Sequence, residues 1–383
     1  MRVCHVSPHL PPDQAANALL PASLGAWTQA AGGEVTFVAH EPSQGGRDTL
    51  ALAGPIFRVP KRDQGASLRR WLRLDALQLS HQIGRTLDRA AADADVVHLH
   101  SNGLIVEAAA AWCRRHGKPH VLTLYGTEIW HYRRRRPIDP FTRAYHRAGA
   151  VTFYSRGLLE RARGLGLGRA AMQVIYPAVS GAFSALGDGE RAAARDALGI
   201  GEPRVLLNVK RLHPLAGQHT LIEAFRRVVH DRHDVRLVIC GTGSLRAELE
   251  AQAQHSGVAD RITFTGLVEN DRVARYAAVA DAFVLPSLLE AMPTVAVEAL
   301  ACGTPVVSAD HPGGLELHEL FGEDVRVVPK DDAAALAAAI GQAIEHPRRV
   351  AAGTFDIIRE RFSPSAVHRA YDEVYARLAR RAA

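Results

Sequence analysis

The 383-residue sequence lacks the features that mark membrane-spanning, secreted and disulfide-bonded proteins. It has no apolar stretch of about 18 residues or more, which a membrane-spanning helix needs. Its first residues, MRVCHVSPHLPP, contain no hydrophobic segment of the kind found in signal peptides. No CxxC pair occurs among its four scattered cysteines, Cys4, Cys113, Cys240 and Cys302. We therefore expect small buried thiols in a reducing compartment and a cytoplasmic location, with peripheral contact at the inner membrane face left open.

The charge balance is only mildly basic and does not indicate nucleic-acid binding. The net charge is +6 and the isoelectric point is about 9.3, while 47% of the residues are hydrophobic and 22% are charged. This composition is typical of a globular chain with a full core. The excess of arginine suits an anionic ligand or a loose membrane-surface contact. Because no RNP, zinc-finger or helix-turn-helix pattern is present, we expect no nucleic-acid partner.

Short β-rich segments alternate with longer amphipathic segments along the chain. Several of the β-rich segments are nearly continuous apolar runs, which are typical of parallel strands buried on both faces. Helical patterns of roughly 10–15 residues separate most of them, and this alternation predicts an α/β fold with doubly wound parallel sheets. The predicted strands cover residues 2–7, 34–40, 56–60, 95–100, 120–126, 150–155, 172–177, 204–209, 235–240, 262–266, 281–286, 304–309 and 325–329.

These strands are too many for one open sheet, so the sequence predicts two domains. Residues 180–190, SGAFSALGDGE, are rich in glycine and serine and have little periodicity, and we interpret them as the hinge. The predicted domains are Rossmann-like and cover residues 1–180 and 181–363. Ligands of such sheets bind at the carboxyl ends of the strands, so two sheets facing each other would enclose a cleft.

The last segment, about residues 364–383, has the pattern of an amphipathic helix. Ser363 and Ser365 are both candidates for its N-cap. In a two-domain α/β chain we expect such a helix to pack back onto the first domain.

Two glutamates frame a predicted helix start in the segment PSLLEAMPTVAVEALACGTPVV. Glu290 follows a predicted strand, and the helix is expected to begin near Thr294 because proline is favoured at a first helical position. The free N–H groups of Thr294, Val295 and Ala296 would then offer a phosphate site. Glu298, one turn into the helix, suits a ribose diol, and Glu290 suits a sugar hydroxyl. From the spacing alone, a solvated helix glutamate and a loop charge remain the alternative.

Two other strand ends carry residues that suit an anionic ligand. The segment CGTGSLRAELEA opens a helix, and its Gly241 and Gly243 would let the backbone approach a ligand closely. A tight turn between strand and helix is the alternative. Lys210 and Arg211 follow the preceding strand and could neutralise a diphosphate, the arginine by a bidentate fork. For this pair, the alternative is a solvated basic loop.

Taken together, these segments resemble the family-4 class of retaining glycosyltransferases, which have the two-domain fold called GT-B. The resemblance rests on LVICGTGSLRAELE, DRITFTGLV, ADAFVLPS, EAMPTVAVEALACGTPVVSADHPGG and the final helix, in this order and spacing. It is strong over about residues 200–345 and looser over residues 1–180. It implies an acceptor-binding first domain and a nucleotide-sugar-binding second domain, with parallel sheets that face a central cleft.

The resemblance also implies an activity and roles for individual residues. By this resemblance, Glu290 contacts hydroxyls of the donor sugar, Glu298 contacts the ribose and Arg211 meets the diphosphate. The backbone of Thr294 and Val295 cradles phosphate, and the segment from Arg261 to Phe264 lies near the base. The family transfers a sugar from a nucleotide-diphosphate sugar with retention of anomeric configuration, usually without a bound metal. We therefore expect a hexosyltransferase with no metal or other cofactor. UDP is the expected nucleotide, with GDP open, and the acceptor is a glycan, a lipid-linked sugar or a small metabolite.

Three positions depart from the family pattern. Ala216 stands where the family usually has a lysine of the diphosphate clamp, and Lys210 or His213 is expected to compensate. Tyr125 stands in a first-domain motif that often reads His-Gly or His-Thr, and we expect it to line the reacting pocket. The usual glycine-rich first loop reads PPDQAANALLP, in which Asn17 could offer its side-chain amide to the donor.

Histidines and arginines outside these motifs suggest weaker hypotheses. His98 and His100 alternate on one predicted strand, and because no complementary cluster is evident, a structural or acceptor-lining role is favoured over a metal site. The arginine-rich residues 131–147 and 67–85 could touch anionic lipid or a phosphorylated acceptor. A solvated arginine-rich face is the favoured alternative.

Two other functions compete with sugar transfer. One is a sugar-nucleotide-binding pseudoenzyme or partner subunit, which Ala216 and Tyr125 motivate and which the two glutamates and Arg211 argue against. The other is a different GT-B enzyme, such as a sugar-nucleotide epimerase or a phosphorylase. A phosphorylase that uses pyridoxal phosphate needs a Schiff-base lysine, and neither Lys210 nor Lys330 lies in a suitable setting.

Overall fold

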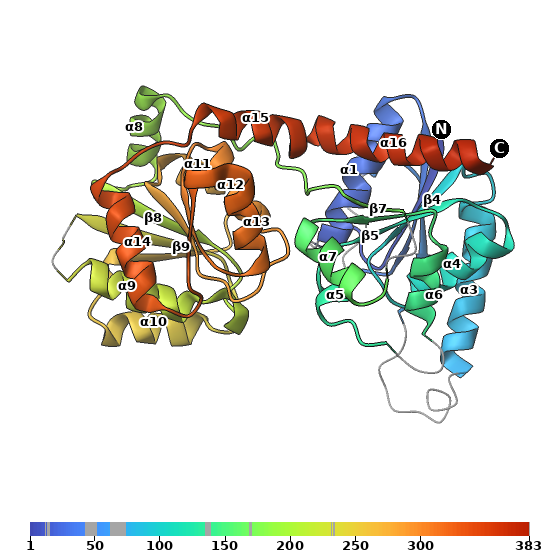
Figure 1. The fold of residues 1–383 in the computed structure, drawn as a ribbon, viewed down its shortest axis with the longest axis horizontal. Coiled ribbons are helices and arrows are strands. Elements are labelled where there is room, and N and C mark those ends of the chain that lie inside the picture. The colour runs from blue at the N-terminus through green and yellow to red at the C-terminus, as the bar shows by residue number, and fades with distance from the viewer. Residues whose placement is uncertain are drawn as a thin grey trace. The chain divides into compact units, whose positions relative to one another are not determined.

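The computed structural model divides the chain into two compact α/β units (Figure 1). Unit 1 comprises Met1–Ile175 and His368–Ala383, and unit 2 comprises Tyr176–Val367. The structure describes residues 1–11, 13, 16–42, 52–61, 74–134, 139–167, 171–230, 232 and 234–382.

Unit 1 is built on a seven-stranded parallel sheet with the strand order β3-β2-β1-β4-β5-β6-β7. All seven strands were predicted from the sequence, although several end a few residues earlier than expected. The strands are β1 (Arg2–Ser7), β2 (Glu34–His40), β3 (Ile56–Val59), β4 (Val96–His100), β5 (His120–Leu124), β6 (Ala150–Phe153) and β7 (Met172–Val174). The helices are α1 (Ala16–Ala30), α3 (Leu74–Ala90), α4 (Leu104–Arg115), α5 (Thr127–Trp130), α6 (Pro140–Arg147) and α7 (Arg156–Gly164).

Unit 2 is built on a six-stranded parallel sheet with the order β10-β9-β8-β11-β12-β13. The strands are β8 (Arg204–Val209), β9 (Val235–Cys240), β10 (Ile262–Gly266), β11 (Ala282–Leu285), β12 (Val306–Ala309) and β13 (Val325–Val328), all of them predicted. The helices are α8 (Asp188–Ala197), α9 (Gln218–Val228), α10 (Arg246–His255), α11 (Asn270–Val279), α12 (Thr294–Ala301), α13 (Pro312–Phe321), α14 (Ala333–Glu345) and α15 (Ala352–Arg361).

The sheet of unit 2 is buried on both faces because its central strands are apolar at nearly every position along their length. Val205 and Leu207 of β8 pack with residues of α11 and α12, whereas Leu206 between them packs with α9 and α14. Consecutive side chains of a strand point to opposite faces, so one apolar run supplies two cores. Helices α9 and α14 accordingly lie on one side of the sheet, and α12 and α13 lie on the other (Figure 1).

The C-terminal helix α16 (Pro364–Ala382) joins unit 1 for most of its length. Ser363 caps it, since its hydroxyl accepts the N–H of Ala366 at 3.2 Å, and Ser363 is therefore the N-cap of the two candidates. Further along, the Trp27 indole donates to Asp372 at 2.8 Å. The Trp27–Asp372 bond ties the helix to unit 1 by polar groups, and Tyr371, Val374 and Tyr375 of the helix are buried.

The hinge expected at residues 180–190 is instead part of unit 2. Val179 and Phe183 are buried in the core of that unit, and the N–H of Val179 donates to the carbonyl of Phe362 at 2.7 Å. The prediction missed this because two apolar side chains anchor a segment whose glycines suggested freedom. The boundary between the units lies earlier, between Ile175 and Tyr176.

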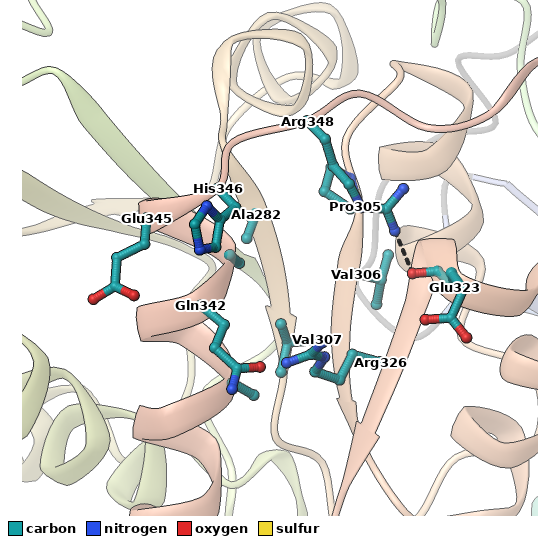
Figure 2. A pocket seen from close by; sticks show the side chains of 12 residues that line it. Ala282, Pro305, Val306, Val307, Glu323, Arg326, Gln342, Glu345, His346 and Arg348 are labelled. Carbon is teal, nitrogen blue, oxygen red and sulfur yellow. Dashed lines mark hydrogen bonds between the residues drawn. The ribbon is translucent and has the colours of Figure 1, made fainter.

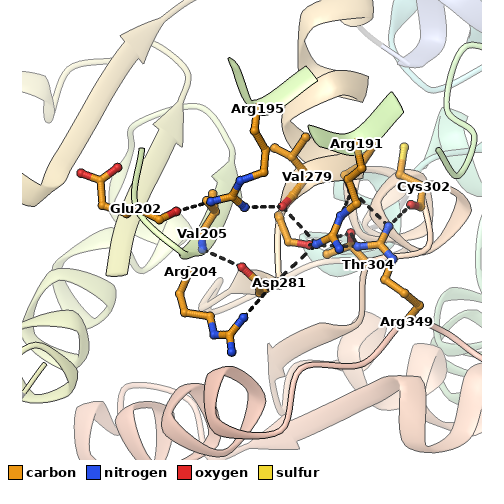
Figure 3. Close-up of polar contacts among 12 residues, drawn as sticks. Arg191, Arg195, Glu202, Arg204, Val205, Val279, Asp281, Cys302, Thr304 and Arg349 are labelled. Atoms are coloured by element: carbon orange, nitrogen blue, oxygen red, sulfur yellow. Dashed lines mark hydrogen bonds and ion pairs between the residues drawn. The ribbon is translucent and has the colours of Figure 1, made fainter. Parts of the chain in front are cut away.

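Three arginines, Arg191, Arg195 and Arg349, gather at the carboxyl end of α11 (Figure 3). Arg191 donates to carbonyls of residues 278–280 at 3.0 to 3.4 Å. Arg349 donates to two of the same carbonyls at 3.1 Å and also to the carbonyl of Cys302, the C-cap of α12. Carbonyls at a helix end carry negative partial charge, so Arg349 joins the ends of two helices. Burial, chiefly, lowers the pKa of Arg349 to about 10.

We expect Arg349→Met to lower the free energy of unfolding of the protein by roughly 2–3 kcal/mol, because several partly buried carbonyls lose a charged donor at once. Urea unfolding of the two proteins, followed by circular dichroism, measures this difference. The matched control is Arg359→Met on α15, since Arg359 pairs with its exposed neighbour Asp356. Its effect should stay within about 0.5 kcal/mol, and equal effects of the two substitutions would contradict the role of Arg349.

Candidate functional site

The centre of the unit 2 sheet brings the predicted charged residues to one edge. Strand β8 pairs with β9 on one side and with β11 on the other. The strand order therefore runs through β9 and β10 on one side of β8 and through β11, β12 and β13 on the other. Such a switch point is where open parallel sheets bind ligands, at the carboxyl ends of the strands. Lys210 and Arg211 follow β8, and Glu290 follows β11. The structure therefore places these three residues at the carboxyl edge, beside the switch point.

Lys210 and Glu290 form an ion pair at this edge. Their side chains are only 21% and 15% exposed, so the pair is largely shielded from solvent. The backbone on each side is fixed: the N–H of Lys210 donates to the carbonyl of Cys240 at 3.0 Å, and the carbonyl of Glu290 accepts the N–H of Gly313 at 3.1 Å. The sequence predicted a cation and a carboxylate here but not that they would pair.

The start of α12 is open, as the sequence predicted. Pro293 is the N-cap residue and provides no side-chain hydrogen bond. In the part of the chain that the structure describes, the N–H groups of Thr294 and Val295 have no acceptor. The N–H of Ala296, expected to be free as well, donates to the carbonyl of Pro293 at 3.0 Å. Two free donors at the positive end of a helix remain to attract an anion.

Glu298 is largely buried one turn into α12, and its carboxyl group has no hydrogen-bond or ion-pair partner among the residues described. Burial raises the pKa of this carboxyl group to about 7. A solvated helix glutamate would show neither property, so that alternative is wrong. A carboxylate kept from water without a partner costs folding free energy, and such groups concentrate at functional sites.

Gly241 and Gly243 serve the packing of the chain itself. A Cβ atom at Gly241, whose φ is +146°, would lie 2.0 Å from the carbonyl oxygen of Lys210, and one at Gly243 would lie 2.0 Å from that of Leu212. The N–H of Leu212 also donates to the carbonyl of Thr242 at 2.9 Å. The two glycines therefore let the loop after β9 lie directly against the loop after β8, which is the turn alternative left open by the sequence.

Arg211 and the residues around it leave a cation available at the edge. Arg211 is exposed, and no ion pair holds its guanidinium within the described part of the chain. Ala216, in contrast, is fully buried, so its position offers no surface group. His213 lies close to Lys210, Arg211 and Glu290, and burial together with the two cations lowers its pKa.

His311 was not singled out from the sequence, although HPGG carried the signal of a helix start. It is fully buried after β12, and its Nδ1 accepts the N–H of Gly314 at 2.9 Å as the N-cap of α13. Burial lowers its pKa to about 4, while the nearby Glu290 acts in the opposite direction. The imidazole is thus neutral beside the Lys210–Glu290 pair.

The expectation for Arg261 is not met by its position. Arg261 precedes β10 and therefore lies at the amino edge of the sheet, and its guanidinium donates to the carbonyl of Arg232 at 2.6 Å. A five-residue strand such as β10 separates its two ends by roughly 15 Å. Gly266, at the other end of β10, is the residue of this strand at the carboxyl edge.

Tyr125 and Asn17 belong to unit 1, and their role toward a donor stays a prediction. The Tyr125 hydroxyl lies 2.8 Å from Nδ1 of His100, and its ring packs edge-on against Tyr154. Burial raises the pKa of Tyr125 well above its usual value. Asn17 lies at the start of α1, where its backbone carbonyl accepts the Ser7 hydroxyl at 2.5 Å.

A buried histidine cluster in unit 1 joins His98 and His100 to His5, which the sequence analysis missed. His5 and His98 are partners in the register of β1 and β4, and Nδ1 of His5 lies 3.0 Å from Nε2 of His100. Ring nitrogens of the three lie within 4.8 Å of one another. The rings of His98 and His100 stack at 3.8 Å, however, so their lone pairs do not converge on one point.

The cluster is instead hydrogen-bonded to hydroxyl groups that surround it. Both ring nitrogens of His98 lie 2.6 Å from hydroxyls, one of Tyr375 on α16 and one of Thr123 on β5. Burial lowers the pKa of His5 to about 3 and the pKa of His98 and His100 well below its usual value. All three histidines are therefore neutral in the folded unit, where they hold α16 against the sheet.

A cavity of about 550 Å³ lies elsewhere in unit 2, at the amino ends of the strands (Figure 2). It opens between α14 and the sheet, where Ala282, Val307 and Ala343 are small enough to leave space. Arg326 and Gln342 extend into this region (Figure 2). None of the residues predicted to bind a donor lines this cavity.

The described part of the arginine-rich residues 131–147 includes α6, which exposes arginines on one face. In α6, Phe141 and Tyr145 are buried, whereas Arg143 and Arg147 are exposed, as on a solvated helix face. In the other arginine-rich segment, residues 67–73 lie outside the described residues. Among the described helices, none combines the length and the hydropathy that a membrane span requires.

Comparison with known proteins shows the family to which the chain belongs. The model for Glycosyl transferases group 1 matches residues 190–362, and the model for Glycosyltransferase Family 4 matches residues 22–181. The chain belongs to the family-4 glycosyltransferases, and the predicted α/β fold class, GT-B, is confirmed.

Individual relatives agree with this family. The GDP-mannose-dependent alpha-(1-6)-phosphatidylinositol monomannoside mannosyltransferase of Mycolicibacterium smegmatis is 32% identical over 54% of this chain and 55% of its own length. The 2-deoxystreptamine N-acetyl-D-glucosaminyltransferase of Streptomyces fradiae is 28% identical over 73% and 70%, respectively. The chain spans about half the length of the first of these curated relatives.

Solved structures share the fold at low identity. The sucrose-phosphate synthase of Thermosynechococcus elongatus has a TM-score of 0.79 and 20% identity, with 99% of each chain covered. Anabaena HepE in complex with UDP also has a TM-score of 0.79, at 19% identity, covering 99% of this chain and 100% of that one.

The histidine cluster predicts that unit 1 loses stability in mild acid. The three histidines are neutral when folded but take up protons near pH 6.5 when unfolded. The stability is thus present above about pH 6.5 and is lost as the pH falls from there toward the folded pKa values, by up to about 1.4 kcal/mol per pH unit for each histidine. All four tryptophans precede residue 176, so tryptophan fluorescence in urea follows unit 1.

We expect His5→Gln to make this loss shallower, because one proton fewer is taken up on unfolding. The control is His81→Gln on α3, where the side chain is exposed. Urea midpoints measured between pH 7.5 and pH 5 compare the three proteins. An unchanged midpoint over this range in the unsubstituted protein would contradict a neutral, buried cluster.

Proposed function

We propose that this protein is a retaining hexosyltransferase that moves a sugar from a nucleotide-diphosphate sugar to an acceptor hydroxyl. Family membership supports sugar transfer, and the residues at the carboxyl edge of unit 2 support the kind of donor. We propose UDP as the nucleotide. The acceptor is a glycan, a lipid-linked sugar or a small metabolite, and peripheral contact with a membrane stays a prediction.

The observation that carries this proposal is the unpartnered, largely buried carboxyl group of Glu298 beside the free N–H groups at the start of α12. An anion suits the N–H groups, and a pair of adjacent hydroxyls suits a carboxylate that has no partner of its own. A nucleotide diphosphate offers both, with its phosphates and its ribose a few bonds apart.

Each charged residue at the edge has a role in the proposed reaction. Glu290 holds hydroxyls of the donor sugar, while Arg211 and Lys210 stabilise the diphosphate as it departs with the bonding electrons. We propose that this leaving group takes the proton of the acceptor hydroxyl on the same face, which gives retention without a protein nucleophile. Positive groups and backbone N–H donors that are already in place then stabilise the developing charge.

We propose that these protein groups act without a bound metal. Lys210, Arg211 and the start of α12 supply the positive charge that a diphosphate needs. Among the described residues, the histidine cluster that could hold a metal ion belongs to unit 1, whereas Lys210, Arg211 and α12 belong to unit 2.

The nucleotides named for two similar proteins indicate which donors to test first. The Mycolicibacterium relative is named for GDP-mannose, and the Anabaena structure holds UDP. UDP remains our proposal, and both nucleotides belong in a donor screen. Because the sequence identity to these proteins is low, the same screen also has to identify the sugar.

A second function, binding of a nucleotide sugar without turnover, is favoured by one observation. Ala216 offers no cation to the diphosphate, and Lys210, which would replace it, is held by Glu290. A pseudoenzyme or partner subunit would bind a nucleotide sugar and leave it intact. A screen that follows both binding and turnover separates this function from transfer.

We expect Glu290→Gln and Arg211→Ala each to lower sugar transfer by about a hundredfold or more, because each removes a group that acts on the departing donor. The measurement is release of nucleoside diphosphate, followed by NMR with a panel of UDP-, GDP-, ADP- and dTDP-sugars and pooled acceptors. The matched controls are Glu223→Gln and Arg226→Ala, an exposed ion pair on α9. Unchanged transfer in both site variants would contradict the roles proposed for Glu290 and Arg211.

The raised pKa of Glu298 predicts that donor binding releases a proton. The free carboxyl group is about half protonated near pH 7, whereas the ionised form accepts hydrogen bonds from both ribose hydroxyls. Affinity for a nucleotide sugar, whose diphosphate does not titrate here, should therefore rise between about pH 6 and pH 8. Calorimetry in buffers of different ionisation enthalpy counts the proton, and Glu298→Gln should abolish its release. Equal affinity across this range would contradict the role of Glu298.

A further inference from the structure

The Lys210–Glu290 ion pair joins two side chains that the proposed reaction assigns to different parts of the donor. Lys210 would meet the diphosphate, and Glu290 would meet hydroxyls of the sugar. In the structure the two hold each other and are largely shielded from water. Each part of the donor must therefore compete with a partner already in place.

The surroundings make it costly to leave either member of the pair alone. His213 and His311 lie close to both members of the pair, and both histidines have lowered pKa values because of their burial. Arg211 follows Lys210 in the chain but is exposed, and among the described residues no ion pair joins it to Glu290. Neutral imidazoles do not replace Lys210 as a counter-ion for Glu290. A shielded carboxylate that loses its cation is left with an unmet charge.

Fixed backbones limit how the pair can respond. The N–H of Lys210 is bonded to the carbonyl of Cys240 at the end of β9, and Gly241 of the following loop lies against the carbonyl of Lys210. Glu290 is bonded to the start of α13. The loops cannot follow a ligand without breaking these bonds. The pair can open only by rotation of the two side chains, and it opens when a ligand offers each of them a new partner.

We infer that the Lys210–Glu290 pair makes the donor site select an intact nucleotide sugar over the nucleoside diphosphate that remains after transfer. This inference rests on the proposed function. An intact donor gives Lys210 a phosphate and gives Glu290 the hydroxyls of the sugar, so both side chains exchange one partner for another. A nucleoside diphosphate draws Lys210 away and leaves Glu290 unpaired beside an anion. The pair thus weakens binding of the product selectively and promotes its release.

The test is a set of binding measurements by calorimetry with the full chain. The probes are two matched pairs, UDP with UDP-glucose and GDP with GDP-mannose. The proteins are the unsubstituted chain, Glu290→Gln, Lys210→Met and the double variant. Because Glu290→Gln also removes a negative charge, the matched control is Asp310→Asn. Asp310 follows β12 at the same sheet edge, but its carboxylate accepts the N–H of Lys330 at 2.8 Å instead of pairing with Lys210.

The pair makes opposite predictions for the two kinds of ligand. Glu290→Gln should bind the nucleoside diphosphate about tenfold more tightly, because Lys210 is released, and the nucleotide sugar about tenfold more weakly, because an acceptor for sugar hydroxyls is lost. Asp310→Asn should change both affinities by less than about threefold. In the Lys210→Met background, Glu290→Gln should strengthen binding of the nucleoside diphosphate less than it does in the unsubstituted chain, because no lysine is released and only the repulsion by Glu290 is removed.

The outcomes separate this inference from the function on which it rests. If a nucleotide sugar binds but Glu290→Gln leaves nucleoside diphosphate affinity unchanged or lowers it, the selection by the pair is wrong and the donor site stands. The selection is wrong as well if Asp310→Asn strengthens nucleoside diphosphate binding as much as Glu290→Gln does. If no nucleotide or nucleotide sugar binds the unsubstituted, folded chain, the proposed function fails and the inference fails with it.

Discussion

The parallel pairing of β8 with β9 and β11 is the constraint on which the site of unit 2 depends. Because the strands run in one direction, their following loops all begin at the same edge of the sheet. Backbone bonds between the chain after β8 and the chain after β9 then fix the position of the Lys210 backbone. Glycine is needed at position 241, because a Cβ atom there would collide with the carbonyl of Lys210. Charged groups far apart in the sequence thereby meet, because the backbone that carries each of them is already fixed.

Three features limit the charge of the groups at the carboxyl edge of unit 2. Lys210 and Glu290 neutralise each other, Glu298 is partly protonated near neutral pH because burial raises its pKa to about 7, and His311 is neutral because burial lowers its pKa to about 4. Removal from water disfavours the charged form of each group. A ligand with phosphates and hydroxyls would supply what each of them lacks, so binding and redistribution of charge at this edge are one event.

The fold could be predicted from the sequence more completely than the site. The central strands among the described residues were found because burial on both faces leaves an apolar run, and α12 was found because Pro293 marks its start. These signals are local. Arg261 was misplaced because a resemblance does not say at which end of β10 a side chain lies, and His5 was missed because its partners come from β4. The pairing of Lys210 with Glu290 likewise depends on strand order, which one sequence shows only indirectly.

The position of α16 in the chain has a consequence for the order in which the protein can be completed. His98 lies in β4, yet its hydroxyl partner Tyr375 is 277 residues further along, beyond the whole of unit 2. During synthesis the sheet of unit 1 is made first. Its histidine cluster stays uncovered by α16 until the whole of unit 2 has been made. The earlier unit to leave the ribosome is therefore the later one to close, and the interval in between is when this protein is most exposed to misassembly.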